Sequence, residues 1–271
     1  MLYIISGLLL IIISFLIYKA NQNTKDIQIN KIQIATKQPT KQSNLSILHL
    51  SDLHLENISI TPSQLADKLQ HEKPDIIALT GDFLDRKRTI PKLVPYLEVL
   101  QRMKPKHGIY AVLGNHDYVL KEPHLLQLKE LLTSYDCTVM QNTSETIEIH
   151  NQRINIIGID DYSTNRSDLQ QSYKYVEDGI NIVLTHDPNI VLEMNGYSFD
   201  YLLAGHFHGG QIRYPKAYHL VKMGKLPRLN IVKGLHKHND SPFYISEGLG
   251  QTGVNIRVGS RPEITLHDIA I

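Results

Sequence analysis

Short apolar runs recur along the chain from residue 45 onward, and polar stretches separate them. The runs are four to six residues long and interrupted by few polar side chains. Such near-continuous runs are typical of strands that are buried on both faces. We therefore predict strands at residues 45–50, 76–80, 110–113, 154–159, 180–184 and 201–204.

The stretches between these runs have helical spacing. Helices are predicted at residues 62–72, 90–103 and 124–134. Pro62 and Pro91 fall where two of them begin, a position that tolerates proline because the first amide of a helix has no partner there. Polar and apolar residues alternate over 27–34, which predicts a first strand, and 36–44 is expected to be a loop. The order of elements indicates a layered α/β domain in which helices cover a mixed sheet.

The amino terminus has a different pattern. Residues 2–18 contain no charge and are mostly Leu and Ile. As a helix they would span about 25 Å, slightly less than the roughly 30 Å hydrocarbon core of a bilayer. Tyr3 and Tyr18 suit the two interfaces. We predict a single-pass membrane anchor at residues 1–19, a linker with the possible first strand at 20–44, and the main domain at 45–271.

Two other interpretations of the apolar segment stay open. A cleaved signal peptide would have basic residues before the apolar run and a good cleavage site after it, and neither is present. A core helix would have a polar face, yet only Ser6 and Ser14 offer one. Five lysines, at 19, 25, 31, 37 and 41, follow the apolar segment, and Asp26 is the only acid among residues 19–41. Because positive charge beside a membrane segment tends to stay on the cytoplasmic side, this excess favours a cytoplasmic main domain.

Composition limits the classes of function. Apolar residues make up 42% and charged residues 20% of the 271 residues, as in an ordinary globular protein. The formal net charge of +1 gives no reason to expect a nucleic-acid partner. Cys137 is the only cysteine, so an intrachain disulfide and a cysteine-based zinc site are excluded.

Five short motifs follow predicted strands, and each offers Asp, Asn or His. They are Asp-Leu-His at 52–54, Gly-Asp-Phe-Leu-Asp-Arg at 81–86, Gly-Asn-His-Asp at 114–117, Thr-His-Asp at 185–187 and Gly-His-Phe-His-Gly-Gly-Gln at 205–211. Ligands collect at the carboxyl ends of strands in open α/β sheets, so five loops bring these side chains to one edge. Oxygen and nitrogen donors without a thiolate suit manganese, iron or zinc. Two such ions about 3.5–4 Å apart can bind a phosphoryl group, which predicts a metal-dependent phosphoester hydrolase.

The motifs resemble those of the calcineurin-like metallophosphoesterase superfamily over residues 45–271. The motif at 205–211, with Glu-Gly-Leu-Gly at 247–250 and Arg-Pro-Glu-Ile at 261–264, resembles its bacterial membrane-associated branch. The resemblance implies a four-layer α/β/β/α sandwich of two mixed sheets flanked by helices. It also implies two divalent ions, with manganese expected and iron or zinc as alternatives, and attack by a hydroxide that bridges them.

The resemblance also implies roles for single residues. One ion would be held by Asp52, His54, Asp82 and His208. The other would be held by Asp82 as the shared ligand, Asn115, His186 and His206. His116 would contact the phosphate and would protonate or stabilise the leaving oxygen. Asp85 would orient His116, and Arg86 would contact the phosphate. Asp117 is expected to be a structural partner near the site, and the histidines outside the motifs, such as His219 and His267, to be surface or core residues.

Residues 213–237 contain seven lysines and arginines, and the next acid is Asp240. This segment is either a solvated loop or a basic and apolar rim that rests on an anionic bilayer. Together with the anchor, the rim favours an amphiphilic phosphodiester or pyrophosphate, such as a lipid-linked one, as substrate. The resemblance to the membrane-associated branch implies UDP-2,3-diacylglucosamine as the leading candidate. A general cell-envelope or nucleotide phosphodiesterase is the alternative activity, and a metal-binding scaffold without catalysis is the alternative class.

Overall fold

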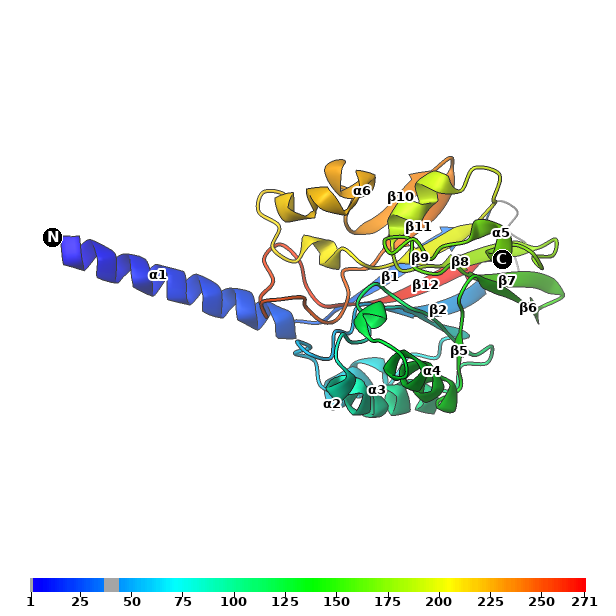
Figure 1. Cartoon of the computed structure of the whole chain (residues 1–271), viewed down its shortest axis with the longest axis horizontal. Helices are drawn as coiled ribbons and strands as arrows, with labels where there is room; N and C mark the ends of the chain where they lie inside the picture. Colours follow the sequence, from blue (N-terminus) through cyan, green and yellow to red (C-terminus); the bar gives the residue numbers. More distant parts are fainter. Residues whose placement is uncertain (1, 37–43) are drawn as a thin grey trace.

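The computed structural model describes residues 2–36 and 44–271 of the chain. A long helix, α1 (Leu2–Gln22), projects from one end of a body built of two sheets and their covering helices (Figure 1). Each sheet has six strands, and the two pack face to face. The predicted sandwich of two mixed sheets flanked by helices is therefore confirmed.

The first sheet holds the strands that precede the first three motifs. Its strands run in the order β1-β12-β2-β3-β4-β5, and only the β12–β2 pair is antiparallel. The bounds are β1 Gln28–Ala35, β2 Asn44–Leu50, β3 Ile76–Thr80, β4 Ile109–Val112, β5 Cys137–Val139 and β12 Glu263–Ala270. The last strand of the chain thus lies between the first two.

The second sheet holds the strands that precede the last two motifs. Its strands run in the order β10-β11-β9-β8-β7-β6, with antiparallel pairs at both edges and parallel pairs between. The bounds are β6 Thr143–Ile149, β7 Gln152–Gly158, β8 Ile180–Leu184, β9 Tyr201–Ala204, β10 Gly234–His238 and β11 Ser241–Ile245.

Helices cover the outer face of each sheet. The first sheet is covered by α2 (Pro62–Leu69), α3 (Ile90–Arg102) and α4 (His124–Ser134), and the second by shorter elements that include α5 (Leu169–Ser172) and α6 (Lys225–Arg228) (Figure 1). Successive side chains of a strand point to opposite faces of its sheet, so they pack in different layers of the domain. Ile77 packs under the helices, whereas Ile76 packs between the sheets. Burial on both faces explains why the strand runs are nearly continuous in apolar residues.

The predicted elements agree with the structure except near their ends. The predicted strand at 27–34 is β1, and the predicted helix at 62–72 ends at Leu69. Thr61 and Gln64 form a reciprocal cap that fixes the start of α2, so Pro62 begins it as expected. The predicted loop at 36–44 falls mostly on residues 37–43, outside the described residues.

Five strands were not predicted, because their length or composition hides them from the sequence pattern. β5 has only three residues, and the edge strands β6 and β10 have many polar side chains that face solvent. β11 contains Pro242, and β12 carries buried polar residues such as Thr265 and His267. Polar groups that are buried inside the sandwich break the apolar run that would otherwise identify a strand.

Candidate metal centre

The five motifs meet where the carboxyl ends of strands from both sheets converge. Asp52 follows β2, Asp82 follows β3 and Asn115 follows β4 in the first sheet. His186 follows β8 and His206 follows β9 in the second. The structure thus brings candidate ligands from two sheets into one place, as the strand-end positions predict.

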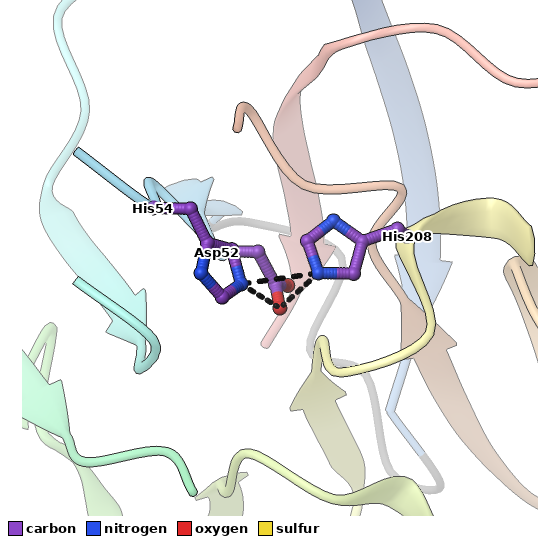
Figure 2. Close-up of side chains that lie close together, drawn as sticks. All are labelled: Asp52, His54 and His208. Atoms are coloured by element: carbon purple, nitrogen blue, oxygen red, sulfur yellow. Dashed lines mark hydrogen bonds and ion pairs between the residues drawn. The ribbon is translucent and has the colours of Figure 1, made fainter. Parts of the chain in front are cut away.

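Asp52, His54 and His208 form the first group of candidate ligands, and all three are buried (Figure 2). The Nε2 atoms of His54 and His208 lie 3.1 Å apart. Oδ1 of Asp52 lies 3.4 Å from Nε2 of His208 and 3.9 Å from Nε2 of His54. Two imidazoles and one carboxylate therefore point their donor atoms at a common space.

Asp82, His186 and His206 form the second group. Nε2 of His186 lies 3.1 Å from Oδ2 of Asp82 and 3.1 Å from Nδ1 of His206. The same Oδ2 of Asp82 lies 3.4 Å from Nε2 of His54 in the first group. One carboxylate oxygen is thus shared by the two groups, which is the arrangement required of a bridging ligand.

Backbone carbonyls fix the orientation of two of the imidazoles. Nδ1 of His186 lies 2.7 Å from the Thr80 carbonyl, and Nδ1 of His208 lies 3.2 Å from the Gly250 carbonyl. A ring that donates from Nδ1 keeps the Nε2 lone pair free for a cation. Both rings therefore present Nε2 to the shared space.

The electrostatics of the cluster agree with a cation site. Burial alone would lower the pKa of His186, but the Asp82 carboxylate outweighs this and raises the pKa well above its ordinary value. Burial would raise the pKa of Asp82, yet His186 and His54 hold it well below the ordinary value. Oδ1 of Asn115 is buried without a hydrogen-bond partner. An unpaired buried acceptor costs free energy unless something binds it, and a divalent ion fits this donor set.

Five candidate ligands have backbone conformations in the left-handed region, which non-glycine residues seldom adopt. Their φ angles are 51° for Asp52, 40° for His54, 54° for Asp82, 75° for His206 and 50° for His208. Such residues cost on the order of 1–3 kcal/mol each and cluster at functional sites. The sharp turn after each strand directs its side chain inward. A side chain at Gly205 would collide with Ser51 and Asp52, so the close packing requires glycine there.

Residues 45–210 match the family described as calcineurin-like phosphoesterase. The chain belongs to this family. It is a metal-dependent phosphoesterase, and its buried His and Asp groups indicate a site for divalent metal.

Two relatives agree with this assignment, and one solved structure shares the fold. The phosphoesterase is 60% identical to the metallophosphoesterase YkoQ of Bacillus subtilis, with 98% of each chain covered. It is 30% identical to the metallophosphoesterase Cj0846 of Campylobacter jejuni, covering 97% of this chain and 69% of the other. The solved structure of TT1561 from Thermus thermophilus has the same fold, with a TM-score of 0.50 at 10% identity over 76% of this chain and 91% of that one.

Asp117 joins two of the phosphoesterase's motif loops. Its carboxylate accepts hydrogen bonds from the backbone amides of Asp82 at 2.9 Å and Phe83 at 2.8 Å, and from Gly114 at 2.9 Å. Asp117 is completely buried and takes part in neither group of candidate ligands. These contacts match its expected role as a structural partner that holds the Asp82 turn against the Asn115 turn.

The structure gives less support to the predicted roles of His116, Asp85 and Arg86. Nδ1 of His116 lies 3.7 Å from Oδ2 of Asp85, which is an ion-pair distance but too long for a hydrogen bond. The Arg86 side chain is 57% exposed and lies 3.4 Å from Asp85. His116 lines the cavity beside the centre, and Arg86 is not among the described residues that line it. The roles of all three stay predictions.

Two positioning residues were missed by sequence reasoning. Oε1 of Glu56 accepts from the amides of Asp85 at 3.2 Å and Arg86 at 3.1 Å, and so fixes that loop. Arg257 is fully buried, and its guanidinium donates to the Gly250 carbonyl at 2.7 Å. The same carbonyl orients His208. Neither residue stands in a motif, so no local signal could have identified it.

Proposed function

We propose that this phosphoesterase hydrolyses a phosphodiester or pyrophosphate bond in an amphiphilic substrate at a membrane surface. The observation that carries the reaction is the sharing of Oδ2 of Asp82 between two groups of buried ligands. A cavity with apolar walls opens beside this centre, and a long apolar helix leaves the same body. Together these features support phosphate chemistry on a substrate that also has an apolar part.

The ligand assignment in this proposal follows the two groups. Asp52, His54, Asp82 and His208 would hold one ion, and Asp82, Asn115, His186 and His206 would hold the other. When bound, two manganese ions supply positive charge for the phosphoryl oxygens and make a water acidic enough to attack phosphorus. His116, at the wall of the cavity, donates a proton to the leaving oxygen. In this proposal Asp85 orients His116, and Arg86 contacts the phosphate.

The membrane part of the proposal rests on α1. The helical segment Tyr3–Lys25 is long and apolar enough to cross a bilayer. Its side chains from Tyr3 to Tyr18 are mostly exposed, which is unlike a core helix, while a signal sequence stays the alternative. The lysines that follow it favour a cytoplasmic catalytic domain. Membrane fractionation of the full chain, with protease protection to determine its side, tests both points.

UDP-2,3-diacylglucosamine is one substrate of the proposed class. Lipid A, for which it is a precursor, belongs to Gram-negative bacteria, whereas the relative at 60% identity comes from Bacillus subtilis. We therefore place it in a panel with other lipid-linked pyrophosphates and phosphodiesters. Release of UMP, or of the corresponding alcohol, identifies the bond that is cleaved.

The primary test uses the full chain and a generic aryl phosphodiester. Bis(4-nitrophenyl) phosphate turnover is measured after metal removal and after addition of Mn²⁺, with metal content determined by elemental analysis. The expected result is about two ions per chain and activity that depends on them. Stoichiometric metal without turnover of any phosphoester would favour the scaffold and contradict the proposed enzyme.

A further inference from the structure

The cavity beside the candidate metal centre is larger than a phosphate requires. Its volume is about 550 Å³, within the range of small-molecule sites. Asn115 and His116 line its inner part. Its outer walls are largely apolar, with Phe207, Ile212, Leu220, Met223 and Val254, and the polar side chains of Gln211, His219 and Thr252 also line it. The space therefore suits an apolar group attached to the phosphate.

One wall of this cavity is held rigidly. The side-chain amide of Gln211 donates to the carbonyls of Thr252 at 2.9 Å and Val254 at 3.0 Å. It also accepts from the Thr252 amide at 3.0 Å. A wall that is fixed before the ligand arrives reduces the entropic cost of binding.

The same wall adjoins the base of α1. Asn21 donates to the Asn255 carbonyl at 2.8 Å, and the Arg257 amide donates to the Ala20 carbonyl at 2.9 Å. Val254 is next in sequence to Asn255 and is 57% exposed. If α1 crosses the bilayer, this edge of the cavity is therefore held at the membrane surface.

Other apolar side chains are exposed along residues 212–229, which contribute another part of the cavity wall. This segment contains the short helix Tyr218–Met223, whose Leu220 and Met223 face the cavity. The exposed apolar residues of the segment are Ile212, Tyr214, Tyr218, Val221 and Leu229. Lys222 and Lys225 of the same segment line an adjoining cavity of about 620 Å³ that shares His206 and Met223 with the first, and the carboxylates of Asp187 and Glu193 line it as well. Apolar groups beside cations complement an anionic lipid surface.

From this continuity we propose that the 550 Å³ cavity is a binding site for the alkyl or acyl chain of a lipid phosphoester, which enters from the bilayer at the base of α1 beside Val254. The proposal rests on the proposed function, because the chain is placed relative to a phosphate held at the metal centre. The polar part of the substrate lies toward the lysine-lined cavity. The walls at Ile212 and Val254 select for chain length.

The test compares esters that share one leaving group. Full-length enzyme reconstituted in vesicles is given hexadecyl, methyl and thymidine 5′-(4-nitrophenyl) phosphates, and kcat/KM is measured for each. The hexadecyl ester is expected to exceed the methyl ester by at least about tenfold, because several methylene groups become buried. The I212D/V254D variant should lower this hexadecyl-to-methyl ratio about tenfold. V254L should retain it.

The control is Tyr175→Asp, because Tyr175 is an exposed side chain that follows α5 in the sequence and is not among the described residues that line the cavity. It should change neither rate. An equal loss of hexadecyl and methyl turnover in I212D/V254D, or no preference for the hexadecyl ester in the wild type, would overturn the chain site. A preference for the thymidine ester would indicate that the cavity binds a nucleoside, and it would also overturn the proposed chain site. Turnover of none of the three esters would instead contradict the proposed function.

Discussion

Six histidines are buried in the described structure, and they lie in two regions with different surroundings. His54, His186, His206 and His208 face Asp52 and Asp82 at the edge of a cavity. His49 and His267 lie between the sheets, with ring centres 5.6 Å apart, and no carboxylate among the described residues pairs with either ring. Both regions contain imidazole nitrogens. Only the first region also has the negative carboxylates and the open cavity that a metal site needs.

The two regions also differ in proton affinity. Burial lowers the pKa of His49 to about 3, despite the distant Asp52 charge, and it lowers the pKa of His267 well below the ordinary value. In the other region the Asp82 carboxylate reverses the effect of burial at His186. An unpaired ring nitrogen occurs in the inner pair as well, at Nδ1 of His49 and Nε2 of His267. A buried histidine with an unpaired nitrogen is therefore not sufficient evidence of a metal site. The neighbouring carboxylates and the adjoining cavity distinguish the candidate metal centre from the inner pair.

The largest expected effect comes from removing the shared carboxylate. Asp82→Asn should reduce aryl phosphodiester turnover by about 10⁴-fold or more and lower the metal content, since both ligand groups lose their common charge. Wild type should also lose thermal stability in chelator, whereas the variant should not. The matched change in the other region, His267→Gln, should leave metal content intact. Full activity of Asp82→Asn would contradict the mechanism.

His116→Gln should separate catalysis from metal binding. We expect kcat to fall by about 10²–10³-fold, because the leaving oxygen no longer receives a proton, while both ions stay bound. The defect should be smaller for a 4-nitrophenyl leaving group than for an alkyl one, which needs the proton more. An equal defect for both leaving groups would argue against the acid role.

Arg257→Met tests the positioning of His208 from a distance. The variant leaves the carbonyls of Glu247, Gly248 and Gly250 without this donor. We expect metal affinity to fall by about 10–100-fold, the usual size for lost support of a ligand. Competition with a chelator of known affinity measures it. The partly exposed Arg261→Met is the control, and equal affinities for both variants would remove Arg257 from this role.

The smallest effect concerns the inner histidine pair. Below pH 6.5 the unfolded chain protonates His49, whereas the folded chain, with its pKa of about 3, does not. The unfolding free energy should therefore fall by about 1.4 kcal/mol per pH unit from this group as pH drops from about 6.5 toward 3. His49→Gln should flatten that slope in urea titrations, with exposed His71→Gln as control. Parallel slopes for wild type and His49→Gln would contradict it.

Much of the fold was predictable, because a strand that is buried on both faces appears in the sequence as a continuous run of apolar residues. The runs before Asp52, Asp82 and His186 are apolar in both layers and proved to be strands. β12 was missed because it carries polar residues inside the sandwich, where Thr265 Oγ1 donates a hydrogen bond to Glu263 Oε1 at 2.7 Å. These polar residues interrupt the apolar run that would have predicted a strand. A buried polar network has no local periodicity, so tertiary contacts alone reveal it.

The sequence by itself determined the ligand types, their order and their positions at strand ends, because strand and turn are local consequences of residue type. Tertiary structure decided that Oδ2 of Asp82 serves both ligand groups, that Arg257 supports His208 through Gly250, and that Val254 lies at the base of α1. These relations join residues that are far apart in the chain. They depend on how the two sheets and the last loop pack, and no window of sequence contains that information.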